Sequence, residues 1–162
     1  MKTKLTWKKG FLSTTYQIYS GDKKVGELKE RSLGTKAYGY LNNKKYRFVS
    51  TGIFHRTTAI IDIKTEHTIG AITYNTWHTK AKISAFAEVY NWKFNNMWNT
   101  RWSLYEHGKL LVSSEGSASQ GNIELEDTEE SLVLSGLFVT NYYWQYTAVF
   151  AALIPVFIVM FT

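Results

Sequence analysis

The sequence predicts a mainly β protein with antiparallel strands, followed by a hydrophobic helix. Three observations support this. Aromatic and β-branched residues recur in short alternating bursts between turn residues, which is typical of barrels and sandwiches. No proline precedes Pro155, and long apolar stripes at helical spacing are missing before the last segment. Residues 131–162 contain no Asp, Glu, Lys, Arg or His, which is the pattern of a helix buried in protein or lipid.

The expected strands follow one another as hairpins. Turn residues separate several of them, including Gly21, where glycine supplies a positive φ, and the pairs Asn42 with Asn43 and His107 with Gly108. The expected strands cover residues 15–19, 24–30, 36–41, 45–50, 58–63, 68–74, 80–90, 91–94, 101–106, 110–114 and 121–126. At a spacing of about 8 to 12 residues, this amounts to about ten to twelve strands.

The expected strand 80–90 indicates what the interior contains. One of its faces would carry small to medium side chains, namely Ala81, Ile83, Ala85, Ala87 and Val89. Small inward-pointing side chains leave space inside a barrel, and a helix about 10 Å across would fit into that space. We therefore expect a barrel of about twelve strands closed around a helix at about residues 128–146, so that residues 1–146 form one domain.

The uncharged C-terminal run has two unlike halves. Residues 131–146 include Ser135, Thr140, Asn141 and Gln145, whose polar groups need partners, and Asp127 or Thr128 is expected to cap this helix. Residues 147–161 contain only Thr147 and Pro155 besides apolar residues. The first half is therefore expected inside the barrel. Residues 147–162 are a candidate membrane anchor, with the aromatic residues of 142–146 as an interfacial belt.

Charge is unevenly distributed along the chain. Residues 1–109 hold all 19 Lys and Arg with seven acids, a net charge of +12, whereas residues 110–130 hold six acids and no base. No apolar stretch of a signal peptide follows the basic start. We expect a membrane-associated protein on the cytoplasmic face, where basic residues are retained and anionic headgroups attract them. An ordinary solvated basic surface on a cytoplasmic protein is the alternative.

The residues as a whole resemble a known superfamily. Residues 121–144 resemble the scramblase segment in which a last strand, an acidic stretch and a buried helix follow each other. Two short motifs are similar to strands of the same group: Ile-Gly-x-Ile at residues 69–72 and Tyr-x-Trp-Lys at residues 90–93. This group comprises the tubby C-terminal domain, the phospholipid scramblases and the LURP-one-related proteins. The resemblance covers residues 3–145 and implies a twelve-stranded barrel around a hydrophobic helix.

Basic residues beside aromatic ones are the candidate lipid-headgroup site. The resemblance to tubby-like domains implies that such cations bind phosphoinositide headgroups, and Lys and Arg suit phosphate chemically. A general basic surface is the simpler interpretation, and a nucleic-acid site comes after both. The candidates are Lys44, Lys45, Arg47, Arg56, Lys80, Lys82 and Arg101.

The acidic stretch before the helix is a candidate calcium site, because scramblase-like proteins are thought to bind calcium there. Its carboxylates are Glu126, Asp127, Glu129 and Glu130, but they lack the spacing of a strong calcium loop, and helix capping explains them more simply. His55, His67, His78 and His107 show no zinc spacing. Neither a phosphate loop nor a nucleophile elbow is present, so we expect no enzyme and no cofactor.

Two functions follow as hypotheses. The first is a non-enzymatic, membrane-associated module of the tubby or scramblase type, which contacts anionic lipid. The second is a soluble barrel that carries a small ligand or acts as a protein-interaction scaffold, with all of residues 131–162 buried or in a dimer contact.

Overall fold

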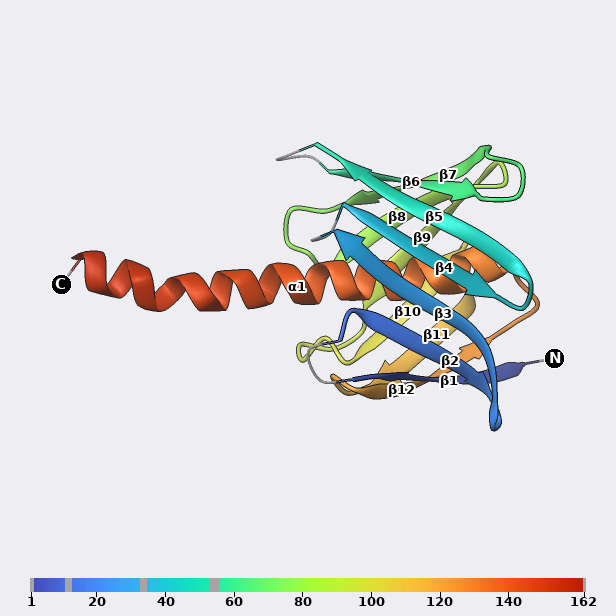
Figure 1. Cartoon of the computed structure of the whole chain (residues 1–162), viewed down its shortest axis with the longest axis horizontal. Helices are drawn as coiled ribbons and strands as arrows, with labels where there is room; N and C mark the ends of the chain where they lie inside the picture. The colour runs from blue at the N-terminus through green and yellow to red at the C-terminus, as the bar shows by residue number, and fades with distance from the viewer. Residues whose placement is uncertain (1, 11–12, 33–34, 53–55, 162) are drawn as a thin grey trace.

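The computed structural model describes residues 2–10, 13–32, 35–52 and 56–161, and in these it shows a closed antiparallel barrel of twelve strands and one long helix (Figure 1). This confirms the predicted fold class. Each strand pairs with the next along the chain, and β12 pairs with β1 to close the barrel, with Leu5 opposite Ile123. The elements are β1 (Thr3–Lys9), β2 (Thr15–Ser20), β3 (Lys23–Ser32), β4 (Lys36–Leu41), β5 (Lys44–Thr51), β6 (Thr57–Asp62), β7 (Thr68–Tyr74), β8 (Lys80–Ala85), β9 (Glu88–Phe94), β10 (Arg101–Glu106), β11 (Lys109–Gly116), β12 (Gln120–Leu125) and α1 (Glu130–Phe161).

The predicted continuous strand 80–90 is wrong. The chain turns back at Phe86 and Ala87, which both have positive φ (54° and 62°), and Ala85 pairs with Glu88 across the turn. The residues that flank a two-residue turn lie on the same face of the sheet, so the turn shifts the inward parity by one. Ala81, Ile83 and Ala85 point inward as expected, but Val89 is 46% exposed and Tyr90 takes the inner face instead.

β1 was not among the expected strands. Its alternation is short and lies within a strongly basic segment, so Leu5 and Trp7 alone mark the inner face. This strand pairs with β2 on one side and, on the other, with β12, which closes the barrel.

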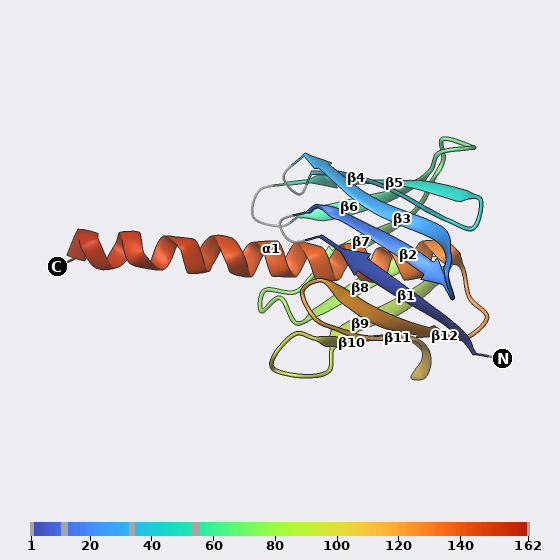
Figure 2. The same cartoon turned by 60° about the horizontal axis from the view of Figure 1, so that its bottom comes forward.

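α1 runs through the barrel and emerges from one end (Figures 1 and 2). Large side chains of its first half contact different strands of the inner face: the Phe138 and Phe48 (β5) rings stack with centroids 5.0 Å apart, and the Tyr143 and Trp92 (β9) ring centroids are 5.5 Å apart. The barrel is closed, and α1 also contacts β3, β4, β8 and β10. Strands on all sides therefore enclose this part of the helix. Its fully or nearly fully buried residues are Ser131, Leu132, Val133, Leu134, Ser135, Gly136, Leu137, Phe138, Val139, Thr140, Asn141 and Tyr143.

Gly136 lets the helix approach β10 closely. A Cβ atom at this position would overlap the six-membered ring of Trp102, which is itself buried. The inside of the barrel therefore does not accept every hydrophobic helix. The inward-pointing indole of Trp102 fits only because α1 has no side chain at Gly136.

α1 is one continuous helix, beginning at Glu130 and continuing past Pro155 to Phe161. It therefore starts after Asp127 and Thr128, two residues later than expected. The hydroxyls of Ser135 and Thr140 donate to helix carbonyls one turn back, at 2.6 and 2.8 Å. Two of the polar groups inside the barrel are thus satisfied by the helix itself.

Candidate functional site

We call the end of the barrel from which α1 emerges the exit end. Here the side chains of α1 change from buried to exposed. Within the described residues, burial of the helix side chains ends near Tyr143, and from Thr147 onward the helix is exposed. α1 is long and apolar enough to cross a membrane, and the stretch of the helix that is apolar enough to do so is not buried in the protein. Its exposed large side chains include Leu153, Ile154, Val156, Ile158, Val159, Met160 and Phe161.

A polar network holds the helix just inside the exit end. Nδ2 of Asn141 donates to Oε2 of Glu30 at 2.7 Å, and Nε2 of Gln145 donates to the same oxygen at 2.5 Å. Oδ1 of Asn141 accepts longer bonds from the Tyr16 hydroxyl and the Lys9 ammonium, both at 3.4 Å. Burial lowers the pKa of Lys9, and the nearby Glu30 charge partly opposes this. The two amides of α1 thus stabilise a buried carboxylate of β3.

Two loops beside the emerging helix have the same sequence pattern, which the sequence analysis did not detect. The β7–β8 loop contains Asn-Thr-Trp-His-Thr-Lys at residues 75–80, and the β9–β10 loop contains Asn-Met-Trp-Asn-Thr-Arg at residues 96–101. The shared pattern is Asn, any residue, Trp, His or Asn, Thr, and a base. A search for short repeats at the ends of the expected strands would have found it.

The two loops also have the same conformation. Oδ1 of Asn75 accepts from the backbone amides of Thr79 and Lys80 at 2.9 and 3.1 Å, and Oδ1 of Asn96 accepts from those of Thr100 and Arg101 at 3.0 and 3.2 Å. The fourth residue of each pattern has a left-handed backbone, with φ of 53° at His78 and 55° at Asn99. In each loop the tryptophan therefore lies at a braced tip.

Both loops contact α1 where it leaves the barrel. The His78 ring lies 4.0 Å from the ring of Tyr146, and Nε1 of Trp144 donates to the carbonyl oxygen of Asn99 at 3.0 Å. The tips themselves point away from the protein: Trp77 is 84% exposed and Trp98 is 85% exposed. Two exposed indoles on neighbouring loops thus lie beside the start of the exposed apolar helix.

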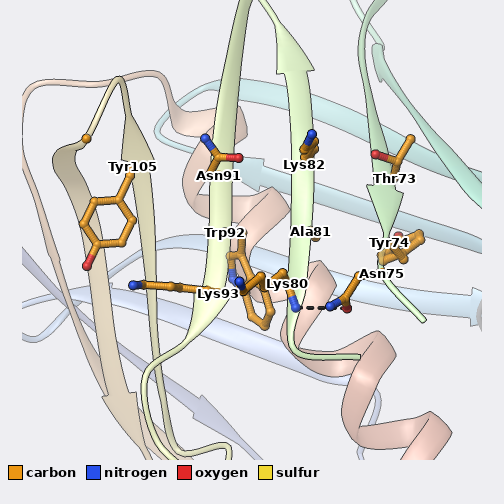
Figure 3. Close-up of a pocket in the computed structure, with 11 residues that line it drawn as sticks. Thr73, Tyr74, Asn75, Lys80, Ala81, Lys82, Asn91, Trp92, Lys93 and Tyr105 are labelled. Atoms are coloured by element: carbon orange, nitrogen blue, oxygen red, sulfur yellow. Dashed lines mark hydrogen bonds between the residues drawn. The ribbon is translucent and has the colours of Figure 1, made fainter. Parts of the chain in front are cut away.

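A basic hollow of about 760 Å³ lies on the outer face of β7 to β10 (Figure 3). Cross-strand pairing places Lys82 next to Thr73 and Asn91, and Lys80 next to Lys93. The Lys93 ammonium lies 5.1 Å from the centre of the Tyr105 ring. Among the described residues, none of these three lysines forms an ion pair with a carboxylate. Such a surface can attract an anion of more than one charge.

Of the candidate headgroup residues, only Lys80 and Lys82 line this hollow, and Lys93 joins them without having been expected. Arg56 lies near Tyr74, where its charge partly opposes the effect of burial, which raises the pKa of that hydroxyl. Arg101 follows the second tryptophan loop and pairs with Glu115 at 2.9 Å.

The other three candidate cations lie elsewhere. Lys44 and Lys45 lie at the end where α1 enters the barrel, which we call the entry end, and both line a separate hollow there. Arg47 pairs with Glu66 at 3.1 Å. The seven predicted cations therefore do not form one cluster.

The acidic stretch meets a lysine. Lys44 lies 3.2 Å from Glu129 and 3.5 Å from Glu130, and the pKa of Lys44 is raised by its bond to Glu129 and by the charge of Glu130. Glu130 also occupies the first turn of α1, where the helix dipole favours a carboxylate. Glu126 and Asp127 precede this turn, and Asp127 lies near the same lysine around a hollow. An ammonium in this position competes with a calcium ion for the carboxylates.

Within the described part of the chain, the one group with metal-ligand spacing is Glu88, Glu106 and His107 at the entry end. His107 lies 2.8 Å from Glu88 and is exposed, so an ordinary surface pair explains this group. His67 and His78 lie in other turns, and His55 lies outside the described residues.

Comparison of the sequence with protein-family models finds no matching model, and comparison with curated proteins finds no similar sequence. The function therefore has to be inferred from the helix and the surfaces described above.

Proposed function

We propose that this protein is a non-enzymatic, membrane-anchored module of the tubby and scramblase type, held on the cytoplasmic face with the exit end of its barrel toward the bilayer. The observation that carries the proposal is the continuity of α1. The same helix is the buried core of the barrel up to Tyr143, and from Thr147 to Phe161 it is uncharged and apolar, with the described side chains exposed. Such a surface is stable in lipid and costly in water.

The superfamily assignment is supported at the level of architecture. A closed twelve-stranded antiparallel barrel with a hydrophobic helix through its centre is the arrangement that the resemblance implies, and the described residues have it. Architecture alone does not assign an activity, because sites rather than folds determine function. Transport of lipid is accordingly not part of the proposal.

Contact with anionic lipid is the second part of the proposal. Lys80 and Lys93 belong to the strand ends nearest the exit end, and Lys82 lies two residues further along β8. If α1 enters the bilayer, these cations approach the headgroups, where each is worth about 1 kcal/mol on an anionic surface. The hollow between them suits a phosphate-bearing headgroup better than an apolar ligand.

Flotation with vesicles, followed by carbonate and high-salt washing, tests the anchoring. The full chain is expected to float and to resist both washes. Replacing Ile154 and Val159 by lysine should release it, since each charge near the centre of a bilayer costs about 2.5 to 3.5 kcal/mol.

The matched control adds the same two charges on the outer face of the barrel, at the exposed positions Gln17 and Asn122. This control variant should stay in the membrane fraction. Recovery of the full chain in the soluble fraction as a discrete dimer would contradict the proposal and favour the soluble scaffold, with the exposed half of α1 in the dimer contact.

A further inference from the structure

We infer that the two tryptophan loops, which are neighbours around the exit end of the barrel, are a second membrane contact, inserted at the bilayer interface beside the helix. We name them the twin loops, residues 75–80 and 96–101. The inference rests on the proposed function, because it requires α1 to enter lipid, and it adds a contact that the helix alone does not require.

The first argument is rigidity between the barrel and the exposed apolar helix. α1 is continuous from the buried core to the exposed part, with no break between Tyr143 and Thr147. The barrel therefore cannot hang from a flexible tether at a distance from the bilayer. Once the helix is inserted, the exit end is held at the membrane surface, and the twin loops are held there with it.

The second argument is the level of the loops along the helix. His78 contacts Tyr146 and Asn99 contacts Trp144, so each loop meets α1 at its change from buried to exposed surface. That change is where the interfacial region of a bilayer would lie. Tryptophan is enriched at this depth, because its ring is amphipathic, with a large apolar face and one N–H donor.

The third argument is the exposure and bracing of the tips. Trp77, Met97 and Trp98 are 84%, 96% and 85% exposed, an apolar surface that a soluble protein rarely leaves in water without a partner. The Asn75 and Asn96 side chains brace the two loops from within. The indoles are therefore presented outward by an ordered turn.

The fourth argument is the repetition itself. The same six-residue pattern at two separate hairpins places a tryptophan at the tip and a base, Lys80 or Arg101, where the next strand begins. An indole at the interface with a cation behind it, toward the headgroups, matches the order of polarity of a bilayer surface.

The absence of cysteine from the sequence allows a direct test on the full chain. Thr76→Cys and Met97→Cys each introduce one thiol beside a tryptophan that stays in place, and both positions are exposed. Asp22→Cys, in the exposed β2–β3 turn at the entry end, is the matched control. Each variant carries an environment-sensitive fluorophore and is reconstituted into vesicles that contain phosphatidylserine.

The two loop labels are expected to shift to the blue, to be shielded several-fold from aqueous iodide relative to the Asp22→Cys label, and to be quenched by nitroxides attached near the lipid headgroup. Replacing both Trp77 and Trp98 by alanine should restore iodide access at the loops while the protein still floats with the vesicles.

Three outcomes would overturn the inference, and they can be told apart. A chain that floats but leaves its loop labels as open to iodide as the control refutes the loop contact alone. Shielding without lipid-nitroxide quenching indicates burial against protein, such as a second copy. A chain that fails to float refutes the anchoring and the loop contact together.

Discussion

Asn141 on α1 donates its side-chain N–H to Glu30 on β3, across 111 positions of the sequence, at 2.7 Å. Both residues are buried, and the second carboxylate oxygen of Glu30 has no partner in the described structure. The helix therefore does more than fill the barrel with apolar volume. One of its amides hydrogen-bonds to a largely buried carboxylate, at the depth where the core ends.

Replacing Asn141 by alanine should destabilise the protein. The change removes the amide and leaves Glu30 with the Gln145 contact alone, and breaking a buried hydrogen bond to a charged group costs about 2 to 4 kcal/mol. Urea unfolding of the full chain in detergent micelles measures the loss. Asn122→Ala, on the exposed face of β12, is the control and should stay within about 0.5 kcal/mol of the parent. Equal values for the two variants would show that the network contributes nothing.

Gly136→Ala should also destabilise the protein, although alanine has a higher helix propensity than glycine. Alanine favours a helix by about 1 kcal/mol over glycine, but here its Cβ overlaps the Trp102 ring, and overpacking of this kind costs about 1 to 3 kcal/mol. The clash with the Trp102 ring can be tested in a double-mutant cycle. In the background of Trp102→Leu, which has a smaller side chain, Gly136→Ala should lower the stability by less. The control is Gly10→Ala, whose Cβ would meet only the Ser13 Cβ at 3.4 Å, an ordinary contact.

Alkaline pH should weaken the fold. Burial raises the pKa of Tyr16 and of Tyr74 above the ordinary value of 10.0. Above pH 10 the unfolded chain releases these protons while the folded chain keeps them, so the free energy of unfolding falls by about 1.4 kcal/mol per pH unit for each tyrosine.

Lys9 acts in the opposite direction. Burial lowers its pKa below 10.5, so the unfolded chain binds this proton more tightly, and raising the pH from the folded pKa to 10.5 adds stability. The contribution of two tyrosines exceeds that of one lysine above pH 10. Urea midpoints measured between pH 10.5 and 11.5, above the window in which Lys9 adds stability, should therefore decrease, with a smaller slope in Tyr16→Phe. An unchanged slope in that variant would refute the assignment.

Removing α1 should prevent folding. Residues 1–130 lack Leu132, Leu134, Leu137, Phe138 and Tyr143 among other core side chains. At about 1.5 to 3 kcal/mol each, their loss alone matches or exceeds the usual 5 to 15 kcal/mol of total stability. Residues 1–146 keep all of these and should show a cooperative melt without detergent. A cooperative melt of residues 1–130 would contradict the role of the helix as the core.

Charge reversal at Lys82 and Lys93 should reduce binding of residues 1–146 to anionic vesicles. If each cation contributes about 1 kcal/mol, reversing two should lower affinity at least about tenfold at low salt. The control reverses Lys23 and Lys109, which are exposed at the entry end, and so has the same net charge. An equal loss in both variants would show that net charge, rather than the basic hollow, attracts the lipid.

Local pattern predicted much of the fold. The alternation along residues 36–41 and the turn at Gly21 were enough to place strands and hairpins, because side-chain parity and positive φ are properties of a few neighbouring residues. The pattern misled where a two-residue turn at Phe86 and Ala87 left the apolar alternation unbroken. It was also too short to predict β1 within a run of lysines.

The candidate site was predicted only in part, because it depends on which strand ends and loops meet. Lys80 and Lys82 were expected, but Lys93 joins them only through the pairing of β8 with β9. Lys44, expected in the same site, instead meets Glu129 at the entry end. Charge and residue type can be read from the sequence, whereas convergence of charges is a property of strand register.

The sequence by itself determined that this chain is a mainly β protein and that its last segment is uncharged and helical, since both follow from periodicity and composition over short windows. Only the tertiary structure decided that Asn141 reaches Glu30 and that the twin loops contact the emerging helix at Tyr146 and Trp144. The physical reason is that these contacts join residues tens to more than a hundred positions apart, and closure of the barrel around the helix is what brings them together.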